Sequence, residues 1–233
     1  MNYNELFSQI QTYTENIFPD TFVELSGGNT STVNVTTQIN TFIEQAEARI
    51  YNMVQIPSLR KNVTGNCSST SKYLACPNDY LSTYSLAVIQ ADGTYEYLLN
   101  KDVNFIRQAY PDPTATGLPR YYALFGSRLN DPNELTFILG PTPDAAYGAE
   151  LHYFYYPESI VTAGTSWLGD NYDPVLLYGS LVEAYTYMKG EADMLSLYNT
   201  KYNEAMMQLN RLGTGLERGD AYRDGQAKIP VNP

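Results

Sequence analysis

The side chains that could carry out acid–base, nucleophilic or metal chemistry are few in this chain of 233 residues, and they are not clustered. The single histidine, His152, lies in a predicted strand without a cysteine or carboxylate pattern beside it, which favours a structural or solvent-facing role. No Gly-x-Ser-x-Gly elbow, phosphate-binding loop or His-Glu-x-x-His motif is present. The stretch LGDNYDP at 168–174 lacks the spaced carboxylates and the terminal Glu of a calcium loop.

Paired carboxylates are the remaining candidates for catalysis. Glu44 and Glu47 are assigned to the polar face of one predicted helix, where a solvated surface is the usual explanation. Glu191 and Asp193 lie at the start of another helix. A glycosidase would need two carboxylates facing each other across a cleft, and nothing in the sequence points to that arrangement. The sequence therefore predicts a protein that is not an enzyme and that uses no cofactor or metal.

Two cysteines, Cys67 and Cys76, stand on either side of a predicted turn. They could pair across two strands, but the chain shows no targeting signal, and its first basic residue is Arg49. Disulfides are rare in reducing compartments, so we expect two buried thiols. No apolar run approaches the length of a membrane span, so no membrane contact is expected.

The net charge of −11 bears on nucleic acids. A sequence-independent binder needs a basic face that releases counterions from phosphate, so the excess of acid argues against one. The same charge is compatible with a surface past which DNA moves without binding. The chain also holds 22 tyrosines, which suit either surfaces that become buried against partners or the rims of a β-rich core, and both interpretations stay open.

Two helices are predicted before residue 57. Leu6, Ile10, Tyr13 and Ile17 recur at helical spacing over 3–18, and Pro19 follows. The polar stretch SGGNTSTVN at 26–34 is typical of a loop. A second helix is expected to begin near Thr36 or Thr37 and to end at Pro57, with an apolar stripe of Ile39, Ile43, Ala46, Ile50 and Met53.

From about 58 to 160 the pattern changes to the period of two that is typical of strands. The stretch SLAVIQADGTYEYLL at 85–99 predicts a hairpin with Asp92-Gly93 as a two-residue type I′ turn. The stretches 120–126, 134–141 and 149–157 are expected to form a meander. Both faces of the last stretch carry aromatic side chains, so we expect both to be covered.

Helical periodicity returns after residue 170. Asp173 is expected to cap a helix over 173–189 with Pro174 at its first position, and Gly190 to separate it from a last helix. A connection this short makes the two helices antiparallel. The last helix carries an apolar seam made of Leu195, Tyr198, Tyr202, Ala205, Leu209 and Leu212.

Together these elements predict an α+β protein in three parts. Residues 1–57 and 161–212 form a helical bundle, 58–160 a β-rich insert, and 213–233 a flexible C-terminal arm. The arm is rich in glycine and mixed charge, so it is either a disordered tail or a segment that orders on a partner. The expected bundle core includes Ile39, Ile43, Ala46, Ile50, Leu195, Tyr198, Tyr202 and Leu209.

The order of these segments resembles the head-to-tail adaptor, or connector, proteins of tailed bacteriophages. The resemblance rests on the helical run LLYGSLVEAYTYMKGEADMLSLYNTKYNEAMMQLNRL at 176–212, the tail ERGDAYRDG at 217–225 and the stretch LTFILGPTPDAAYGAELHYFYYPESI at 135–160. The stretch INTFIEQAEARIYNMVQIPSLRKNVT at 39–64 is similar to the family's opening helix and first strand. The Tyr-rich insert is larger than in the simplest members.

The resemblance implies a structural virion protein that forms a ring, usually twelvefold, in the neck between the portal and the tail. Its partners would be the portal protein, a tail nozzle or tail tube protein, and other copies of itself, after assembly in the host cytoplasm. Double-stranded DNA would pass through without sequence-specific binding. The C-terminal arm would reach the portal, and its candidate contacts are Arg211, Arg218, Tyr222 and Arg223.

A second class of function stays open. A tyrosine-rich β insert could instead stack on sugar rings, as in a carbohydrate-binding or tail-associated binding module. Independently of the sugar-binding alternative, the acidic charge suits the wall of a DNA channel, or it simply keeps the free subunit soluble. The mixed-charge arm favours an assembly component, because a sugar-binding module has no need of such an arm.

Overall fold

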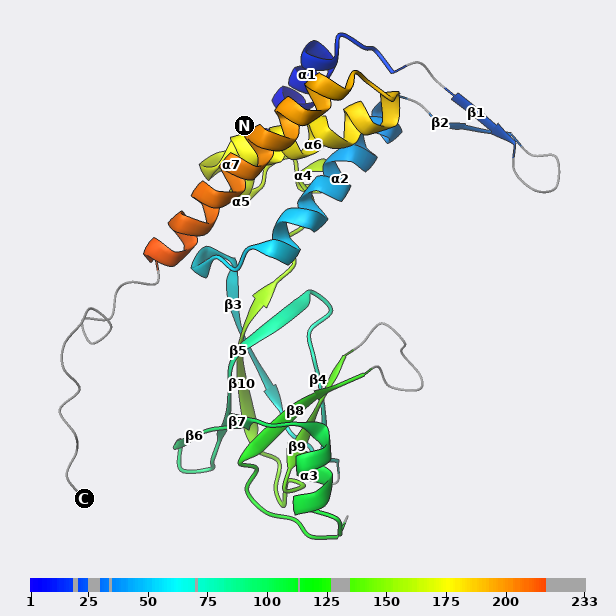
Figure 1. The fold of residues 1–233 in the computed structure, drawn as a ribbon. Helices are drawn as coiled ribbons and strands as arrows, with labels where there is room; N and C mark the ends of the chain where they lie inside the picture. The colour runs from blue at the N-terminus through cyan, green and yellow to red at the C-terminus, as the bar shows by residue number, and fades with distance from the viewer. Residues whose placement is uncertain are drawn as a thin grey trace. The chain divides into compact units, whose positions relative to one another are not determined.

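A computed structural model of the chain describes residues 1–18, 21–24, 30–33, 35–69, 71–112, 114–126 and 135–216. The chain divides into two units, a helical unit made of 1–57 with 157–233 and a β-rich unit made of 58–156. The long helices lie in the first unit and the two larger sheets in the second (Figure 1). The structure is thus mixed helix and sheet, which confirms the predicted α+β class.

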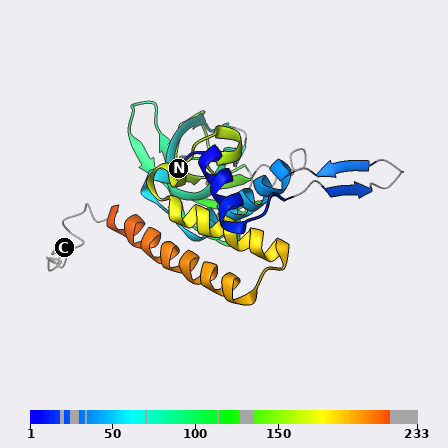
Figure 2. The ribbon, with the colours of Figure 1, turned by 90° about the horizontal axis from the view of Figure 1, so that it is seen from above.

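Helix α6, Asp173–Met188, is the central element of the helical unit, because it buries residues around most of its circumference. It packs against α1, α2, α5 and α7. Figure 2 shows α6 and α7 running side by side in opposite directions. The other helices are α1 (Tyr3–Thr14), α2 (Val35–Met53), α4 (Ile160–Ala163), α5 (Trp167–Asn171) and α7 (Ala192–Leu216).

The ends of these helices differ from the expected ones. Helix α1 ends at Thr14, because Glu15 adopts a left-handed conformation with φ 49°, so the stripe over 3–18 is cut short. Asp173 is the first residue of α6, and the N-cap is Tyr172, which makes no side-chain capping bond. Helix α7 continues to Leu216 and so takes in the first residues of the predicted arm.

Several residues of the predicted apolar stripes lie at the surface. Tyr13 and Ile17 are 44% and 79% exposed, and Met53 and Leu212 are 61% and 40% exposed. All four lie near or beyond the end of a helix. Periodicity identifies the buried face of a helix but does not say how far along its length a neighbouring helix covers that face.

A short hairpin replaces part of the expected polar loop at 26–34. Strands β1 (Thr21–Glu24) and β2 (Thr30–Val33) pair antiparallel, with Phe22 opposite Thr32. Residues 25–29 and 34 lie outside the described residues. The loop prediction gave too little weight to Thr30, Thr32 and Val33, whose branched side chains favour extended backbone.

The β-rich unit holds two four-stranded sheets among its described residues. The first sheet has the order β3-β10-β5-β6, with β3 Arg60–Asn66, β10 Gly148–Tyr155, β5 Tyr80–Ile89 and β6 Tyr95–Tyr97. The second has the order β4-β9-β8-β7, with β4 Tyr73–Ala75, β9 Thr136–Gly140, β8 Tyr121–Phe125 and β7 Leu99–Asn100. A 3-10 turn, η1 (Pro57–Leu59), precedes β3. Only β7 and β8 are parallel among these pairs.

The core of this unit lies between the two sheets. Leu86 and Leu151 from the first sheet pack with Phe137 and Leu139 from the second. The opposite face of the second sheet is covered by helix α3, Val103–Ala109, whose Ile106 packs on Ala123 and Ile138. The second sheet is therefore buried on both sides. Helix α3 was not predicted, although Asp102 caps it through the Asn104 N–H at 2.7 Å.

Two predictions for the β-rich unit are wrong. Strands β8 and β9 pair as expected, but β10 leaves the meander and lies between β3 and β5 in the other sheet. The turn at Asp92-Gly93 is not type I′, because only Gly93 has a positive φ, of 85°. Gly93 N–H bonds the Gln90 carbonyl and Gln90 N–H bonds Thr94, which gives a type I turn followed by a left-handed glycine.

Candidate assembly surface

The single histidine and the paired carboxylates are the residues that the sequence offers for catalysis. His152 is half-exposed on β10, with its Nε2 3.6 Å from Glu150 Oε1, and Glu150 in turn accepts a hydrogen bond from Asn62 at 2.8 Å. The expectation that both faces of β10 are covered holds only in part. On one face Phe154 is buried, but His152 is half-exposed. Among the described residues, no three His, Cys, Asp or Glu side chains are placed to hold a metal ion.

Glu47 is buried, contrary to the expectation of a solvated surface. It is 3% exposed and accepts a hydrogen bond from the Ile160 N–H at 3.0 Å, which ties α2 to the start of α4. Burial raises the pKa of Glu47, and hydrogen bonds from Ser159 and Ile160 reduce that shift. The signal was present in the sequence, because Glu47 stands four residues after Ile43 and three before Ile50, on the apolar face.

The residues expected in the bundle core are buried, with the exception of Leu195. Ile39, Ile43, Ala46 and Ile50 of α2 are fully buried, as is Leu209 of α7, and Tyr198 and Tyr202 are nearly so. Leu195 is only half-buried. Helices α2, α6 and α7 meet at Gly179, where an added Cβ would lie 3.2 Å from both Ala46 Cβ and the Tyr202 ring. A methyl group at this position would require Ala46 or the Tyr202 ring to shift by a few tenths of an ångström, and a larger side chain would require more.

The α7 outer stripe is the most distinctive surface of the helical unit. It consists of six exposed residues without a charge, at alternating spacings of four and three: Ser196, Thr200, Asn203, Met207, Asn210 and Thr214. This is the spacing of a coiled-coil seam. The stripe is mainly polar, with Met207 as its one apolar side chain, and it differs from its surroundings because the charged residues Lys201, Glu204 and Arg211 lie beside it and not on it.

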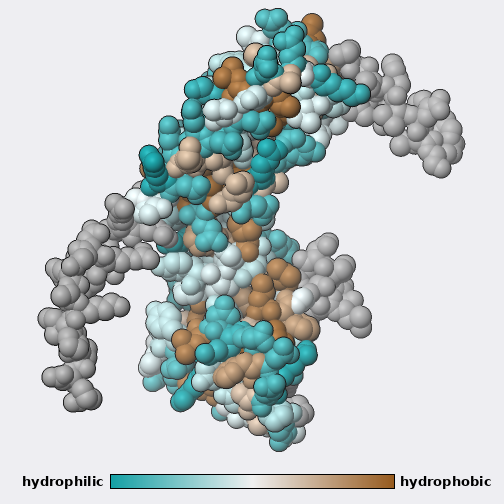
Figure 3. Space-filling view, in the orientation of Figure 1, coloured by the Kyte–Doolittle hydropathy of each residue, from teal (hydrophilic) through white to brown (hydrophobic). Residues whose placement is uncertain are grey.

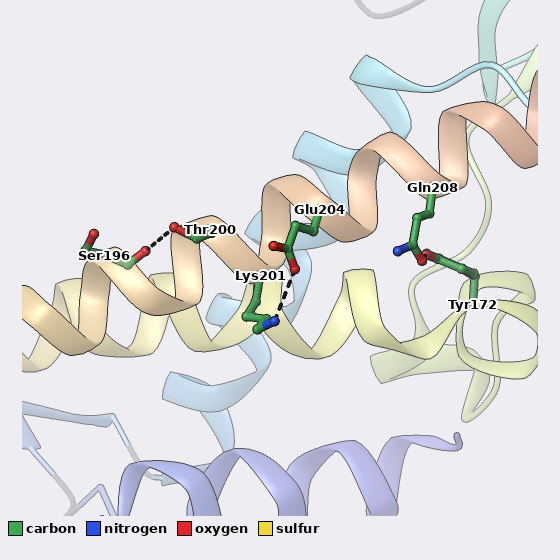
Figure 4. Close-up of polar contacts among 6 residues, drawn as sticks. All are labelled: Tyr172, Ser196, Thr200, Lys201, Glu204 and Gln208. Atoms are coloured by element: carbon green, nitrogen blue, oxygen red, sulfur yellow. Dashed lines mark hydrogen bonds and ion pairs between the residues drawn. The ribbon is translucent and has the colours of Figure 1, made fainter.

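The two threonine hydroxyls of the stripe donate hydrogen bonds to the helix itself. Thr200 Oγ1 donates to the Ser196 carbonyl at 2.9 Å, and Thr214 Oγ1 donates to the Asn210 carbonyl at 3.0 Å. Figure 4 shows Ser196 and Thr200 on α7, with the Lys201–Glu204 ion pair of 3.1 Å further along the helix. Because these two hydroxyls already donate within the helix, a partner could cover Thr200 and Thr214 without leaving their hydroxyls unpaired.

Two polar contacts fix α7 on the rest of the unit. Tyr172 donates to Gln208 Oε1 at 2.7 Å (Figure 4), and Arg49 lies 5.5 Å from the centre of the Tyr202 ring while it pairs with Glu183. Burial raises the pKa of Tyr202, and Arg49 opposes that shift. The helix is thus held by buried rings on one side and leaves its outer stripe exposed on another.

Arg211, the first predicted portal contact, is exposed on the last turns of α7 beside Asn210 and Thr214. Arg218, Tyr222 and Arg223 lie outside the described residues. The structure therefore places one of the four candidates, next to the end of the outer stripe. The sequence analysis did not identify the stripe, because it considered only the apolar seam of this helix. The absence of charge on the opposite face was the signal that could have revealed it.

The β-rich unit has a partly apolar surface (Figure 3). Tyr95 and Tyr97 on β6 are 44% and 66% exposed, and their rings are stacked at 6.4 Å. Both cysteines are buried thiols that form no disulfide, as predicted. Burial raises the pKa of Cys67 to about 11, so this thiol is protonated and unreactive at neutral pH.

Comparison with known proteins gives the family. No described helix is both long and apolar enough to cross a bilayer. A search of the curated proteins found no match. The family model described as SU10 adaptor protein matches residues 1–227, almost the whole chain. The chain therefore belongs to the SU10 adaptor protein family, whose members are structural head-to-tail adaptors of the bacteriophage virion.

Proposed function

We propose that copies of this chain form a closed ring, of about twelve subunits, in the neck of the virion between the portal and the tail. The observation that carries the proposal is the match of the adaptor family over residues 1–227. The ring would assemble in the host cytoplasm and continue the DNA channel. The net charge of −11 supports this role, because an acidic wall repels the phosphates of a passing duplex.

The α7 outer stripe is the proposed contact between neighbouring subunits. A ring needs two different faces of one subunit that meet across each contact. The stripe supplies an uncharged helix face, and the exposed apolar groups Tyr13, Ile17 and Tyr187 supply a second surface on the same unit. Each contact can be weak on its own, because a portal that holds many copies makes the contacts multivalent.

The C-terminal arm is the proposed portal contact. Arg211, Arg218, Tyr222 and Arg223 are its candidate binding residues, because a planar guanidinium can bond a carboxylate or two carbonyls of a neighbour. Arg211 lies at the base of the arm, beside the end of the stripe. The β-rich unit would then contact a tail nozzle or tail tube protein.

The test combines a stoichiometry with one matched pair of variants. The sample is the purified neck, or the chain mixed with its portal. Negative-stain electron microscopy shows its shape and native mass spectrometry gives its subunit number, and we expect a ring. Met207→Glu places a charge in the stripe and should abolish the ring. Gln208→Glu adds the same charge beside the stripe, keeps an acceptor for the Tyr172 hydroxyl, and should leave the ring intact. Both positions are exposed, so the free energy of unfolding of each free variant should lie within about 0.5 kcal/mol of the wild-type value.

One or two copies per particle would exclude the ring. Equal ring formation by both variants would exclude the stripe as its contact, even if the ring exists.

A carbohydrate-binding role has one observation in its favour, the exposed and stacked Tyr95 and Tyr97 rings. Exposed aromatic rings offer faces on which sugar rings can stack. Binding of the wild type to a glycan array, lost in a Tyr95→Ala, Tyr97→Ala double variant and displaced by free sugar, would support it. No binding by the wild type would leave these rings as a protein contact.

A further inference from the structure

The two sheets of the β-rich unit leave an open side between strands β3 and β4. Each is the outer strand of its sheet, and within the described residues β3 pairs with β10 and β4 with β9. An outer strand presents backbone N–H and C=O groups that can pair with an added strand. The opposite side differs, because the chain passes there directly from β6 to β7, with Leu98 N–H bonded to Leu86 and Leu99 N–H to Arg120.

An apolar cleft of about 270 Å³ opens between these two outer strands. Val63 and Gly65 of β3 line one wall, and Leu74 and Cys76 line the other. Leu86 and Phe137, which belong to the core between the sheets, lie at its floor. Val63 is 38% exposed, so the cleft brings the apolar core within reach of solvent.

A site of this kind suits an extended segment with apolar side chains at alternate positions. Such a segment adds as a strand to the outer strand, and every second side chain then points to the same side, here into the cleft. Charged side chains on that side would lose their water without a partner, so the inward positions must be apolar.

The chain itself carries one segment of this type after the end of α7. In Ala227-Lys228-Ile229-Pro230-Val231 the apolar residues Ala227, Ile229 and Val231 stand at alternate positions, and Lys228 with Pro230 stand between them. Proline donates no hydrogen bond and is therefore tolerated in a strand only at an edge or an end. No other run in 217–233 alternates in this way.

We propose that residues 227–231 of one copy add as a strand at the cleft between β3 and β4 of a neighbouring copy. Donor and acceptor are different parts of the same chain, so each insertion links one copy to the next in a fixed direction, as a closed ring requires. The inference rests on the proposed self-assembly. It uses residues distinct from Arg211, Arg218, Tyr222 and Arg223, so the arm can contact the portal through one part and a neighbour through its end.

The native thiol of Cys76 makes the proposal testable by cross-linking, because it lines the cleft. A donor chain carrying Ile229→Cys and Cys76→Ser is mixed with wild-type chain, assembled with the portal and oxidised mildly. A covalent dimer between donor and wild type is expected on a non-reducing gel. The matched donor with Lys228→Cys and Cys76→Ser points its thiol away from the cleft and should give about tenfold less dimer.

Further variants separate the outcomes. A chain with Ile229→Cys alone that cross-links within itself, with no dimer in the mixture, would show that the segment occupies its own copy and would overturn the neighbour contact. A ring without any cross-link would overturn the inference and leave the proposed function intact. The absence of any ring would overturn both this inference and the proposed function.

A last measurement does not depend on the cysteines. Ile229→Asp should leave the melting temperature of the free chain unchanged and reduce incorporation into the ring several-fold, whereas Asn232→Asp, just past the alternating run, should not. Equal incorporation of the two variants would overturn the proposal.

Discussion

Leu209→Asp is the sharpest test of how α7 is held. Leu209 is fully buried at 0% exposure, on the same face of α7 as Tyr202 and Ala205. Truncation of a buried leucine alone costs about 2–5 kcal/mol. The aspartate also brings a charge, or a proton taken up to avoid that charge, into a site without a partner. We expect a loss of at least about 4 kcal/mol, a large part of the 5–15 kcal/mol by which a typical domain is stable.

The neighbouring residue supplies the control. Asn210 is exposed on the outer stripe, so Asn210→Asp adds the same charge one position away and should change stability by no more than about 0.5 kcal/mol. Urea unfolding followed by far-UV circular dichroism measures both variants. If Leu209→Asp and Asn210→Asp unfold at the same urea concentration, α7 does not hold its seam against the other helices, and the outer stripe loses its basis too.

Three other outcomes follow from the contacts described above. Gly179→Val should be less stable than Gly179→Ala by roughly 1–3 kcal/mol, because its extra methyl groups meet Ala46 and Tyr202, whereas alanine offsets its tight contacts by a better helix propensity; equal calorimetric melting temperatures of the two variants would argue against the close approach. Burial raises the pKa of Glu47, so the wild type loses stability as pH rises above about 4.5 and the buried carboxylate ionises. Glu47→Gln keeps the acceptor for the Ile160 N–H, so its melting temperature should rise relative to that of the wild type between pH 4 and pH 7. A constant difference in melting temperature over that range would contradict this. Partial burial opposes ionisation of Asp79, but hydrogen bonds from Lys61 and Tyr153 outweigh this effect and lower its pKa. The free energy of unfolding lost in Asp79→Asn should therefore be greatest near neutral pH and should shrink as pH falls below about 4. Urea unfolding midpoints of the variant and the wild type at pH 7 and pH 3 would check this.

Local patterns in the sequence predict the helices better than they predict what those helices meet. The spacing of Tyr198, Tyr202 and Leu209 gives the buried face of α7, because each helix repeats its geometry every three to four residues. The same spacing extends to Leu212, which is exposed, since the extent of cover depends on a different part of the chain. Glu47 is buried for a similar reason: its partner, Ile160, is 113 residues away.

The strands show the same limit. Alternation identifies the stretch of β10, but not that it pairs with β3 and β5 and not with β9. Period two describes one strand and carries no information on its partner, which is set by the core between the sheets. For the candidate surface, the arginines of the arm could be named from charge alone, whereas the outer stripe became visible only once burial separated it from the seam.

The pairing of β3 with β10 has a consequence for how this gene can change. Arg60, near the start of the β-rich unit, is the cross-strand partner of Phe154, near its end, and such partners have Cα atoms about 5 Å apart. The two points at which the chain enters and leaves the unit are thus nearly the same place. A segment with coincident ends behaves as a genetic cassette: it can be exchanged for another domain, or shortened to a small loop, by recombination at two sites that stay close in space. If the β-rich unit contacts the tail and the arm of the helical unit contacts the portal, as proposed, phages that share a portal but differ in their tails could keep the helical unit and replace only residues 58–156.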